Sequence, residues 1–314
     1  MTSSSEAATA RAGAGAVSGP AVATTASPRG RSRWTNRAIQ AFLALTALVW
    51  LAPLLYTLYT SLRPYSDTAV RGYVSLPGTL NFDNYVAAWT QADMLQFFWN
   101  TIIVTVPAVV LTLLLSSMVA FVVARFSFVT NLTLLIVFTA GNLLPQQVII
   151  TPLYRMFLLI PLPEFLSDSR VLFDSYLGII VIHVAFQMGF CVFVLSNYMK
   201  TLPRELTEAA LVDGTSAWAM FWRIVMPLSR PPLAALATLQ FTWIYNDFFW
   251  ALVLMQSGDK RPITSAIGSL GGLYFTDHNL IAAGALLAAI PTLVVFLLLQ
   301  KQFVRGLTLG STKG

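Results

Sequence analysis

The sequence predicts an all-α integral membrane protein with six transmembrane helices. The first reason is composition: 56% of the 314 residues are hydrophobic, only 10% are charged, and the mean hydropathy is +0.70. Soluble domains carry about 25% charged residues, so this chain has too little polar surface to cover itself in water. The second reason is that the few charges separate long apolar stretches, and the third is an uneven distribution of arginine and lysine between the loops.

The first 37 residues are expected to form a disordered, basic tail. Residues 1 to about 33 are rich in Ala, Ser, Thr and Gly and show no apolar periodicity, a composition typical of disorder. The tail ends in a basic cluster of Arg29, Arg31, Arg33 and Arg37. A cleavable signal peptide is the alternative, but the apolar run that follows is too long for a signal sequence. We therefore expect a retained first helix.

Residues 38–314 form the predicted membrane domain. A helix needs about 20 residues to cross a hydrocarbon core of about 30 Å at 1.5 Å per residue. Stretches of about this length without a charged residue predict six spans at 38–62, 94–124, 126–154, 175–199, 231–246 extending past Asp247 to 258, and 279–300. Prolines within the spans favour kinks, although simple packing geometry is an equally good explanation. The domain ends in a predicted tail at 301–314.

Basic residues assign the two sides, because cytoplasmic loops of membrane proteins carry an excess of lysine and arginine. Six spans place both termini on one side. With cytoplasmic termini, 13 of the 19 basic residues lie inside and 6 lie outside. The outside set is Arg63, Arg71, Arg155, Arg170, Lys260 and Arg261. This asymmetry accounts for the net charge of +6 without a nucleic-acid partner.

The sequence contains no catalytic or metal-binding pattern. Lys200 is the only lysine followed by Ser or Thr, and Met199 stands before it where the Walker A motif requires Gly. The G-x-S-x-G and H-E-x-x-H motifs are also absent from the sequence. His183 and His278 are too far apart to suggest a metal site, and Cys191 is interpreted as a small buried hydrophobe. We therefore expect no enzyme activity in this chain.

Residues 200–230 form the longest predicted cytoplasmic loop, and the loop has a helical pattern of its own. Pro203 suits the first position of a helix, on which Leu206, Ala209 and Ala210 share one face. Gly214 suits the left-handed conformation that ends a helix. Two short amphipathic helices with a glycine between them are typical of a docking element. Interfacial helices lying on lipid are the alternative.

The second of these helices is expected to start from a cap at Thr215 or Ser216. Its apolar residues follow one another at i, i+3, i+4 and i+7, which predicts a single stripe on one face. The stripe consists of Trp218, Phe221, Trp222 and Val225. Pro227 is expected to stop the helix.

The same loop carries a recognisable motif. Residues 208–214 read Glu-Ala-Ala-Leu-Val-Asp-Gly and residues 224–228 read Ile-Val-Met-Pro-Leu. This resembles the EAA loop of bacterial ABC-importer permeases, in which E-A-A, three residues, Gly and nine residues precede I-x-L-P; Met226 replaces the usual Leu. Segments 144–154, 245–250 and 300–314 narrow the resemblance to the maltose-type carbohydrate-uptake branch, with Tyr245 in place of the usual Trp of W-N-D. The resemblance covers about residues 38–314.

The resemblance implies a type I ABC importer permease fold in the bacterial plasma membrane. It also implies a second permease subunit, two ATPase subunits that bind the ATP and Mg²⁺, and an extracytoplasmic binding protein that delivers a sugar or oligosaccharide. This chain itself is expected to bind no cofactor. The residues implied in coupling to an ATPase subunit are Glu208, Ala209, Ala210, Asp213, Gly214, Trp218, Phe221 and Pro227.

Polar residues inside the spans mark a candidate translocation path. Asp247 is the only acid within a predicted span, and a carboxylate near the bilayer centre costs on the order of 2.5–3.5 kcal/mol on insertion scales. It should therefore face the bundle interior or a wet cavity, unless such groups only bond neighbouring helices. Amides and aromatic faces suit sugar hydroxyls. The candidates are Asn142, Gln146, Gln187, Asn246 and Asp247.

Two other functional classes compete with this interpretation. An ion-coupled secondary transporter of a small polar solute would be expected to show internal repeats and several intramembrane ionisable groups. This chain has one intramembrane acid and no obvious repeat. A membrane-anchored scaffold would not need polar residues in its spans.

Overall fold

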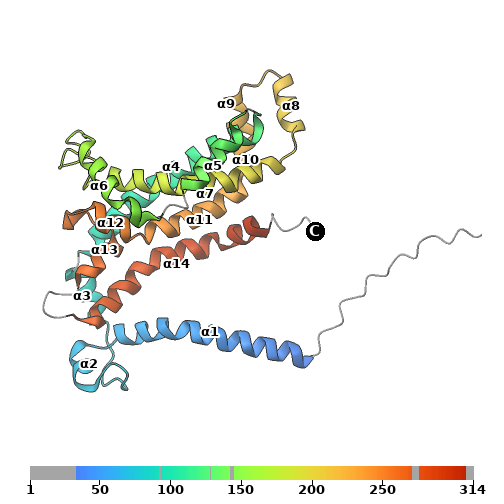
Figure 1. Ribbon diagram of the computed structural model, residues 1–314. Coiled ribbons are helices and arrows are strands. Elements are labelled where there is room, and N and C mark those ends of the chain that lie inside the picture. Colours follow the sequence, from blue (N-terminus) through green and yellow to red (C-terminus); the bar gives the residue numbers. More distant parts are fainter. Residues whose placement is uncertain (1–32, 92, 128, 142–144, 271–275, 309–314) are drawn as a thin grey trace, which may run out of the picture. The chain divides into compact units, whose positions relative to one another are not determined.

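The computed structural model describes residues 33–308 apart from 92, 128, 142–144 and 271–275. Within this part the regular elements are helices (Figure 1), and one isolated β-bridge joins Pro161 to Val171. The chain divides into two compact units, Met1–Ala52 and Pro53–Gly314. The described part of the first unit is the N-terminal portion of α1 (Arg33–Ser61). The packing and the sites below belong to the second unit.

Four helices are long and apolar enough to cross a membrane. They are α1, α4 (Met94–Arg125), α7 (Tyr176–Thr201) and α14 (His278–Thr308). Each coincides with a predicted span, and the bounds of α4 and α7 agree with the prediction within two residues. α14 continues through residues 301–308, which we had expected to belong to a tail. Residues 1–32 and 309–314, predicted as parts of the two tails, lie outside the described residues.

The third predicted span is not one straight helix. It consists of α5 (Asn131–Gly141), followed by η1 (Gln146–Ile149) and α6 (Ile150–Leu159), which make an angle of 89° with α5. Pro145 precedes η1 in an extended conformation with φ −61° and ψ 124°. Proline lacks an amide donor and clashes with a preceding helical turn, so Pro145 disfavours a continuous helix at this point.

The fifth predicted span is also broken. α11 (Arg230–Tyr245) has 16 residues and α12 (Phe249–Leu254) has six. Residues 246–248 separate them, so Asp247 lies at a helix break rather than inside a continuous helix. A 16-residue helix is about 24 Å long at 1.5 Å per residue. By length and composition, the described residues contain four helices that could span a membrane, or five spans if the bent pair counts as one.

The centre of the second unit is built on α4 and α7, which pack along each other. α11 lies against α4, α7 and α14, and α5 lies against α7. Small residues such as Ala108, Ala120 and Ser116 are buried on α4, and the Ser116 hydroxyl donates to the Met188 carbonyl at 3.1 Å. Small residues let membrane helices approach closely, and hydroxyls bond across the interface. The packing therefore depends on close contact.

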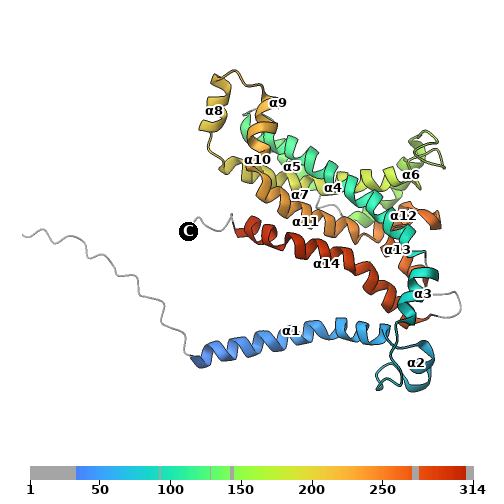
Figure 2. The ribbon, with the colours of Figure 1, turned by 180° about the vertical axis from the view of Figure 1, so that it is seen from behind.

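Short helices gather at the two ends of this assembly. α8 (Glu205–Val212), α9 (Ala217–Met220), the π-helical η2 (Phe221–Val225) and α10 (Met226–Leu228) lie at one end. At the other end lie α3 (Asp83–Gln91), α6, α12, η3 (Gly258–Lys260), α13 (Ile263–Ile267) and η4 (Gly268–Leu270). Figures 1 and 2 show α8 and α9 far from α6, α12 and α13 in both views.

A buried arginine holds the chain between the end of α1 and α2 (Tyr65–Arg71). The Arg63 side chain is fully buried, pairs with Asp67 at 2.7 Å, and donates to the carbonyls of Gly72, Tyr73 and Ser75. The Arg63 carbonyl in turn accepts bonds from side-chain amides on α3 and α14. A buried charge is tolerated when its donors are satisfied. Arg63 therefore holds together the ends of α1, α2, α3 and α14. From the sequence it was interpreted only as a marker of sidedness.

Candidate translocation and coupling sites

The loop between α7 and α11 contains the two predicted short helices and the predicted glycine break. α8 ends in a Schellman motif: the Gly214 amide donates to the Leu211 carbonyl at 3.0 Å, and the Thr215 amide donates to the Ala210 carbonyl at 2.9 Å. Gly214 has φ +74°, in the left-handed region. Ser216 caps α9 by accepting a hydrogen bond from the Ala219 amide at 3.3 Å.

The predicted apolar stripe of the second helix is divided between two environments. Phe221 and Val225 are 2% and 1% exposed and belong to a core cluster with α4 and α7, whereas Trp218 and Trp222 are 60% and 40% exposed. The rings of Trp218, Phe221 and Trp222 nevertheless contact one another, with centroids 5.0–6.2 Å apart, so the predicted stripe forms but only part of it is buried. Residues 221–225 are π-helical, with the Met226 amide bonded to the Phe221 carbonyl. Bonding from i to i+5 changes the angular spacing on which the stripe was drawn.

Pro227 does not end the second helix, contrary to expectation. The helix continues to Leu228 and stops at Ser229, immediately before α11. A proline normally removes the amide that would bond the carbonyl four residues earlier. Here that carbonyl belongs to Arg223, within the π-helical segment, so the helix already departs from the i to i+4 pattern.

Six of the eight predicted coupling residues are exposed: Glu208, Ala209, Asp213, Gly214, Trp218 and Pro227. The other two, Ala210 and Phe221, are buried against the bundle. The predicted shared face of α8 is also divided, since Leu206 is 43% exposed while Ala210 is 6% exposed. The loop thus offers an open surface with two carboxylates and a tryptophan, and two buried side chains anchor it.

A hollow of about 340 Å³ gathers most of the predicted path residues. Its walls come from η1, from α7 and from the break between α11 and α12. They comprise Gln146, His183, Phe186, Gln187, Trp243, Asn246, Asp247, Phe248, Phe249 and Trp250. Four of the five candidates therefore line one cavity, and Asn142 lies outside the described residues. Three neutral amides beside indole and phenyl rings make a surface that suits hydroxyl-rich solutes.

Asp247 organises the broken segment beside this hollow. Its two carboxylate oxygens accept from the amides of Trp250 and Ala251 at 3.3 and 3.1 Å, which caps α12. Its carbonyl accepts from the Thr264 hydroxyl. The carboxylate is 12% exposed. Capping at the start of a helix is a well-known role of Asp, and it gives this acid a structural role within the predicted fifth span.

His183 lines the same hollow, although from the sequence it was considered only as a possible metal ligand and set aside. Its Nε2 atom is buried without a hydrogen-bond partner and lies 3.6 Å from an Asp247 carboxylate oxygen. The side chain is 5% exposed and comes from α7, which faces the break across the hollow. A polar residue 64 positions away in the sequence gives no local signal for this proximity.

Comparison with known proteins decides the family. Residues 92–309 match the family described as binding-protein-dependent transport system inner membrane component. The chain belongs to this family. The matched region covers more than two thirds of the sequence and includes both the hollow and the loop with the EAA motif. The resemblance found in residues 208–228 is thereby confirmed.

Relatives of this permease are named as permease proteins, some of them of uptake systems. A probable ABC transporter permease protein of Pyrococcus horikoshii is 31% identical over 262 residues, covering 83% of this chain and 91% of the relative. The diacetylchitobiose uptake system permease protein NgcG of Streptomyces coelicolor is 30% identical over 273 residues, covering 86% and 87%. A crystal structure of a bacterial ABC transporter that imports alginate matches with a TM-score of 0.72 at 21% identity, covering 88% of this chain and 100% of that one. That match supports the fold.

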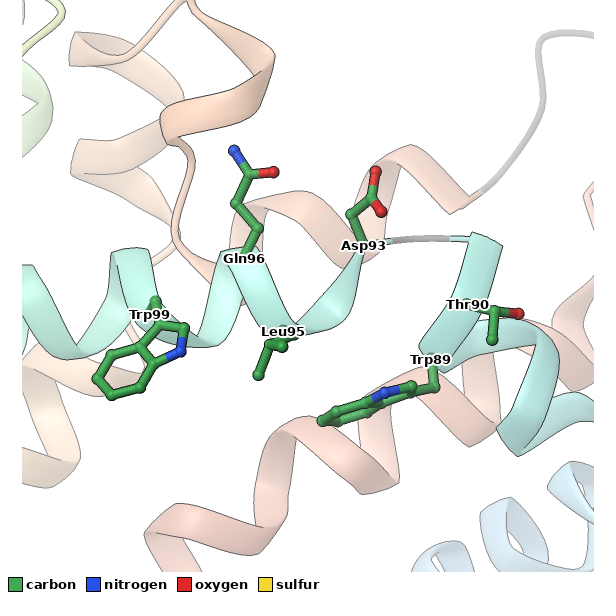
Figure 3. Close-up of a pocket in the computed structure, with 6 residues that line it drawn as sticks. All are labelled: Trp89, Thr90, Asp93, Leu95, Gln96 and Trp99. Atoms are coloured by element: carbon green, nitrogen blue, oxygen red, sulfur yellow. The ribbon is translucent and has the colours of Figure 1, made fainter.

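The permease has a further open hollow of about 550 Å³ between α3 and α4. It is lined by Trp89, Thr90, Asp93, Leu95, Gln96 and Trp99. Figure 3 shows Leu95 and Trp99 on one side of the start of α4, with Asp93 and Gln96 on the other. The polar groups therefore do not converge with the indoles. Exposed tryptophans at one end of a bundle suit the aromatic belt of a membrane interface, so this hollow is not a candidate site.

Proposed function

We propose that this permease forms one half of the translocation path of an ATP-driven carbohydrate importer. The observation that carries the proposal is the hollow in which Gln146, Gln187 and Asn246 lie beside aromatic rings. Neutral amides bond hydroxyls without demanding a charged solute, and aromatic faces pack on apolar faces of sugar rings. The names of several relatives support the same solute class, including uptake systems for diacetylchitobiose, arabinooligosaccharides and alpha-glucosides.

The complete importer in this proposal contains four further protein components. A second permease completes the path, two ATPase subunits bind ATP and Mg²⁺, and an extracytoplasmic binding protein delivers the sugar. The exposed surface of α8 and α9 meets an ATPase subunit, with Glu208 and Trp218 in contact and Ala210 and Phe221 anchoring the loop. Closing of the ATPases moves this surface and reorients the hollow.

The proposal also includes six spans with cytoplasmic termini. α5 with α6 supplies the third span and α11 with α12 the fifth, each interrupted beside the hollow. Unwound backbone at membrane depth is tolerated where it lines a cavity, which supports counting the broken pairs as spans. A periplasm-dependent reporter enzyme inserted near Gly258 should be active, whereas the same reporter fused after Gly314 should be inactive. The opposite pattern would refute the orientation.

An ion-coupled carrier is the competing function. The role of Asp247 distinguishes it from an ATP-driven importer. Both of its oxygens are engaged in capping α12, which suits a fixed structural charge better than a carrier that binds and releases protons. The test is sugar uptake by the reconstituted complex. Uptake should require ATP and persist when the proton gradient is collapsed. Uptake that stops with the gradient while ATP remains would establish the carrier instead.

A further inference from the structure

A hollow lined by basic residues lies at the end of α4 and α7 that carries α8. Its volume is about 380 Å³. Three positively charged side chains line it, Arg125, Lys200 and Arg204, together with one acid, Glu208. The remaining wall is formed by Val123, Ala124, Phe126, Ser127, Asn131, Thr207 and Leu211. Neither the translocation path nor the exposed docking surface uses the three cations.

The charges in this hollow are not neutralised by the chain itself. Among the described residues, no ion pair joins Arg125, Lys200 or Arg204 to a carboxylate. Arg125 and Arg204 are close enough for their charges to repel. Like charges that face one cavity raise each other's energy, and an anion placed between them removes that cost.

The wall also contains a donor that lacks a partner. The Nε of Arg125 is buried without a hydrogen bond in the structure, whereas the unpaired Oδ1 of Asn131 is an acceptor and offers nothing to an anion. The guanidinium uses one nitrogen, Nη1, to donate to the Leu202 carbonyl at 3.2 Å. A guanidinium presents five donors in a fork that suits phosphate oxygens. The spare donors, the lysine and the hydroxyls of Ser127 and Thr207 are a suitable set for a phosphate group.

The position of the hollow indicates where that phosphate group comes from. Arg125 is the last residue of α4, and Lys200 lies in the last turn of α7. Both helices are long apolar spans, so their ends lie at the level of lipid headgroups. Phe126 and Leu211 line the same hollow and are 39% and 54% exposed. An apolar rim beside a basic floor suits a molecule with a charged head and an acyl chain.

We propose that this hollow binds the phosphate headgroup of an anionic phospholipid from the leaflet that faces α8. Basic pockets between the ends of membrane helices are a recognised type of site for anionic headgroups. The proposal requires membrane insertion only, and it does not depend on the solute that the importer carries. Because Thr207, Glu208 and Leu211 of α8 form one wall, a bound headgroup would tie the docking loop to the ends of α4 and α7.

The test is lipid retention by the purified complete importer, measured by native mass spectrometry in mild detergent. The probe is phosphatidylglycerol, compared with phosphatidylcholine as the zwitterionic reference. The test variant is Lys200→Gln/Arg204→Gln, which leaves the partly buried Arg125 in place so that folding is preserved. The matched control is Arg223→Gln/Arg230→Gln, which removes two exposed charges that do not line the hollow.

The importer should retain phosphatidylglycerol over phosphatidylcholine. Each charge removed from the hollow should weaken retention about fivefold, whereas the control should retain lipid like the unmodified complex. Equal loss in both variants, or no loss in either, would overturn the proposal. Displacement of the lipid by millimolar inorganic phosphate would instead assign the hollow to a soluble phosphate. Retention by the permease pair that disappears when the ATPases are added would assign it to the subunit interface.

Discussion

Replacing Gly214 with valine should weaken docking of the ATPase subunit without disturbing the membrane helices. Gly214 adopts φ +74° within the Schellman motif that ends α8. A Cβ atom at this position would have no neighbouring atom within 4 Å. The substitution therefore introduces no clash, and its whole cost is the strain of a β-branched residue in the left-handed region, about 1–2 kcal/mol.

Where that cost appears depends on the state of the loop. In the undocked permease the loop is exposed, so residue 214 can relax to negative φ and release α8 from its present direction. Docking must restore the left-handed turn, so the strain is added to the free energy of association. A cost of about 1–2 kcal/mol lowers affinity roughly 5- to 30-fold. Because Phe221 and Ala210 still anchor the loop, the variant should remain assembled in the membrane.

The assay is titration of purified ATPase subunit onto permease-containing membranes, with Gly214→Asn as the matched control. Asparagine occupies the left-handed region more readily than other residues with a side chain. It should therefore bind within a few-fold of the original chain. Equal affinity of the valine variant and the original would show that docking does not need this turn. Equal loss in the asparagine and valine variants would show that the bare surface of glycine matters, rather than its backbone freedom.

Three further changes test other parts of the reasoning. Glu208→Lys reverses an exposed charge on α8, so the complex should fold while sugar-stimulated ATP hydrolysis falls. Unchanged stimulation would show that Glu208 does not contribute to the interface with the ATPase subunit. Asp247→Ala removes the cap of α12 and should destabilise the complex by about 0.5–2 kcal/mol, whereas Asp247→Asn should keep ATP-driven uptake; thermal unfolding and uptake assays measure the two effects. Burial opposes ionisation of Asp174, but hydrogen bonds from Ser257 and the Gln256 amide outweigh it and lower its pKa. Asp174→Asn should therefore lose stability at neutral pH, and its difference from the original should shrink as the pH falls below about 4, as thermal unfolding across pH would reveal.

The sequence predicted the long helices because their signal is continuous. The stretches 94–124 and 175–199 contain no charge, and the corresponding helices α4 and α7 end at the first basic residues or close to them. The EAA motif located the loop between α7 and α11, Gly214 correctly predicted its turn, and Ser216, one of the two expected caps, is the cap that the structure shows. These features depend on residues that are neighbours in the sequence, so they can be predicted from the sequence alone.

Features that depend on distant contacts were missed. The absence of charge in 126–154 says nothing about the direction of a helix, so the 89° angle between α5 and the segment of η1 and α6 appeared only in the structure. Arg63 was counted as a marker of sidedness, although it is buried by carbonyls contributed from the loop after α2. Residues 221–225 form a π-helical turn, and no residue type in it signals that bonding pattern.

The two departures from straight helices occur on the same cavity, and a physical reason connects them. Gln146 follows the break between α5 and α6, and Asn246 and Asp247 form the break between α11 and α12. A continuous helix satisfies its own backbone and presents only side chains to a passing solute. An interrupted helix exposes amides and carbonyls, which is tolerable at membrane depth only beside water or protein. The breaks therefore cost least where they line a hollow, and Asp247, by capping α12, stabilises the interruption on one side of that hollow.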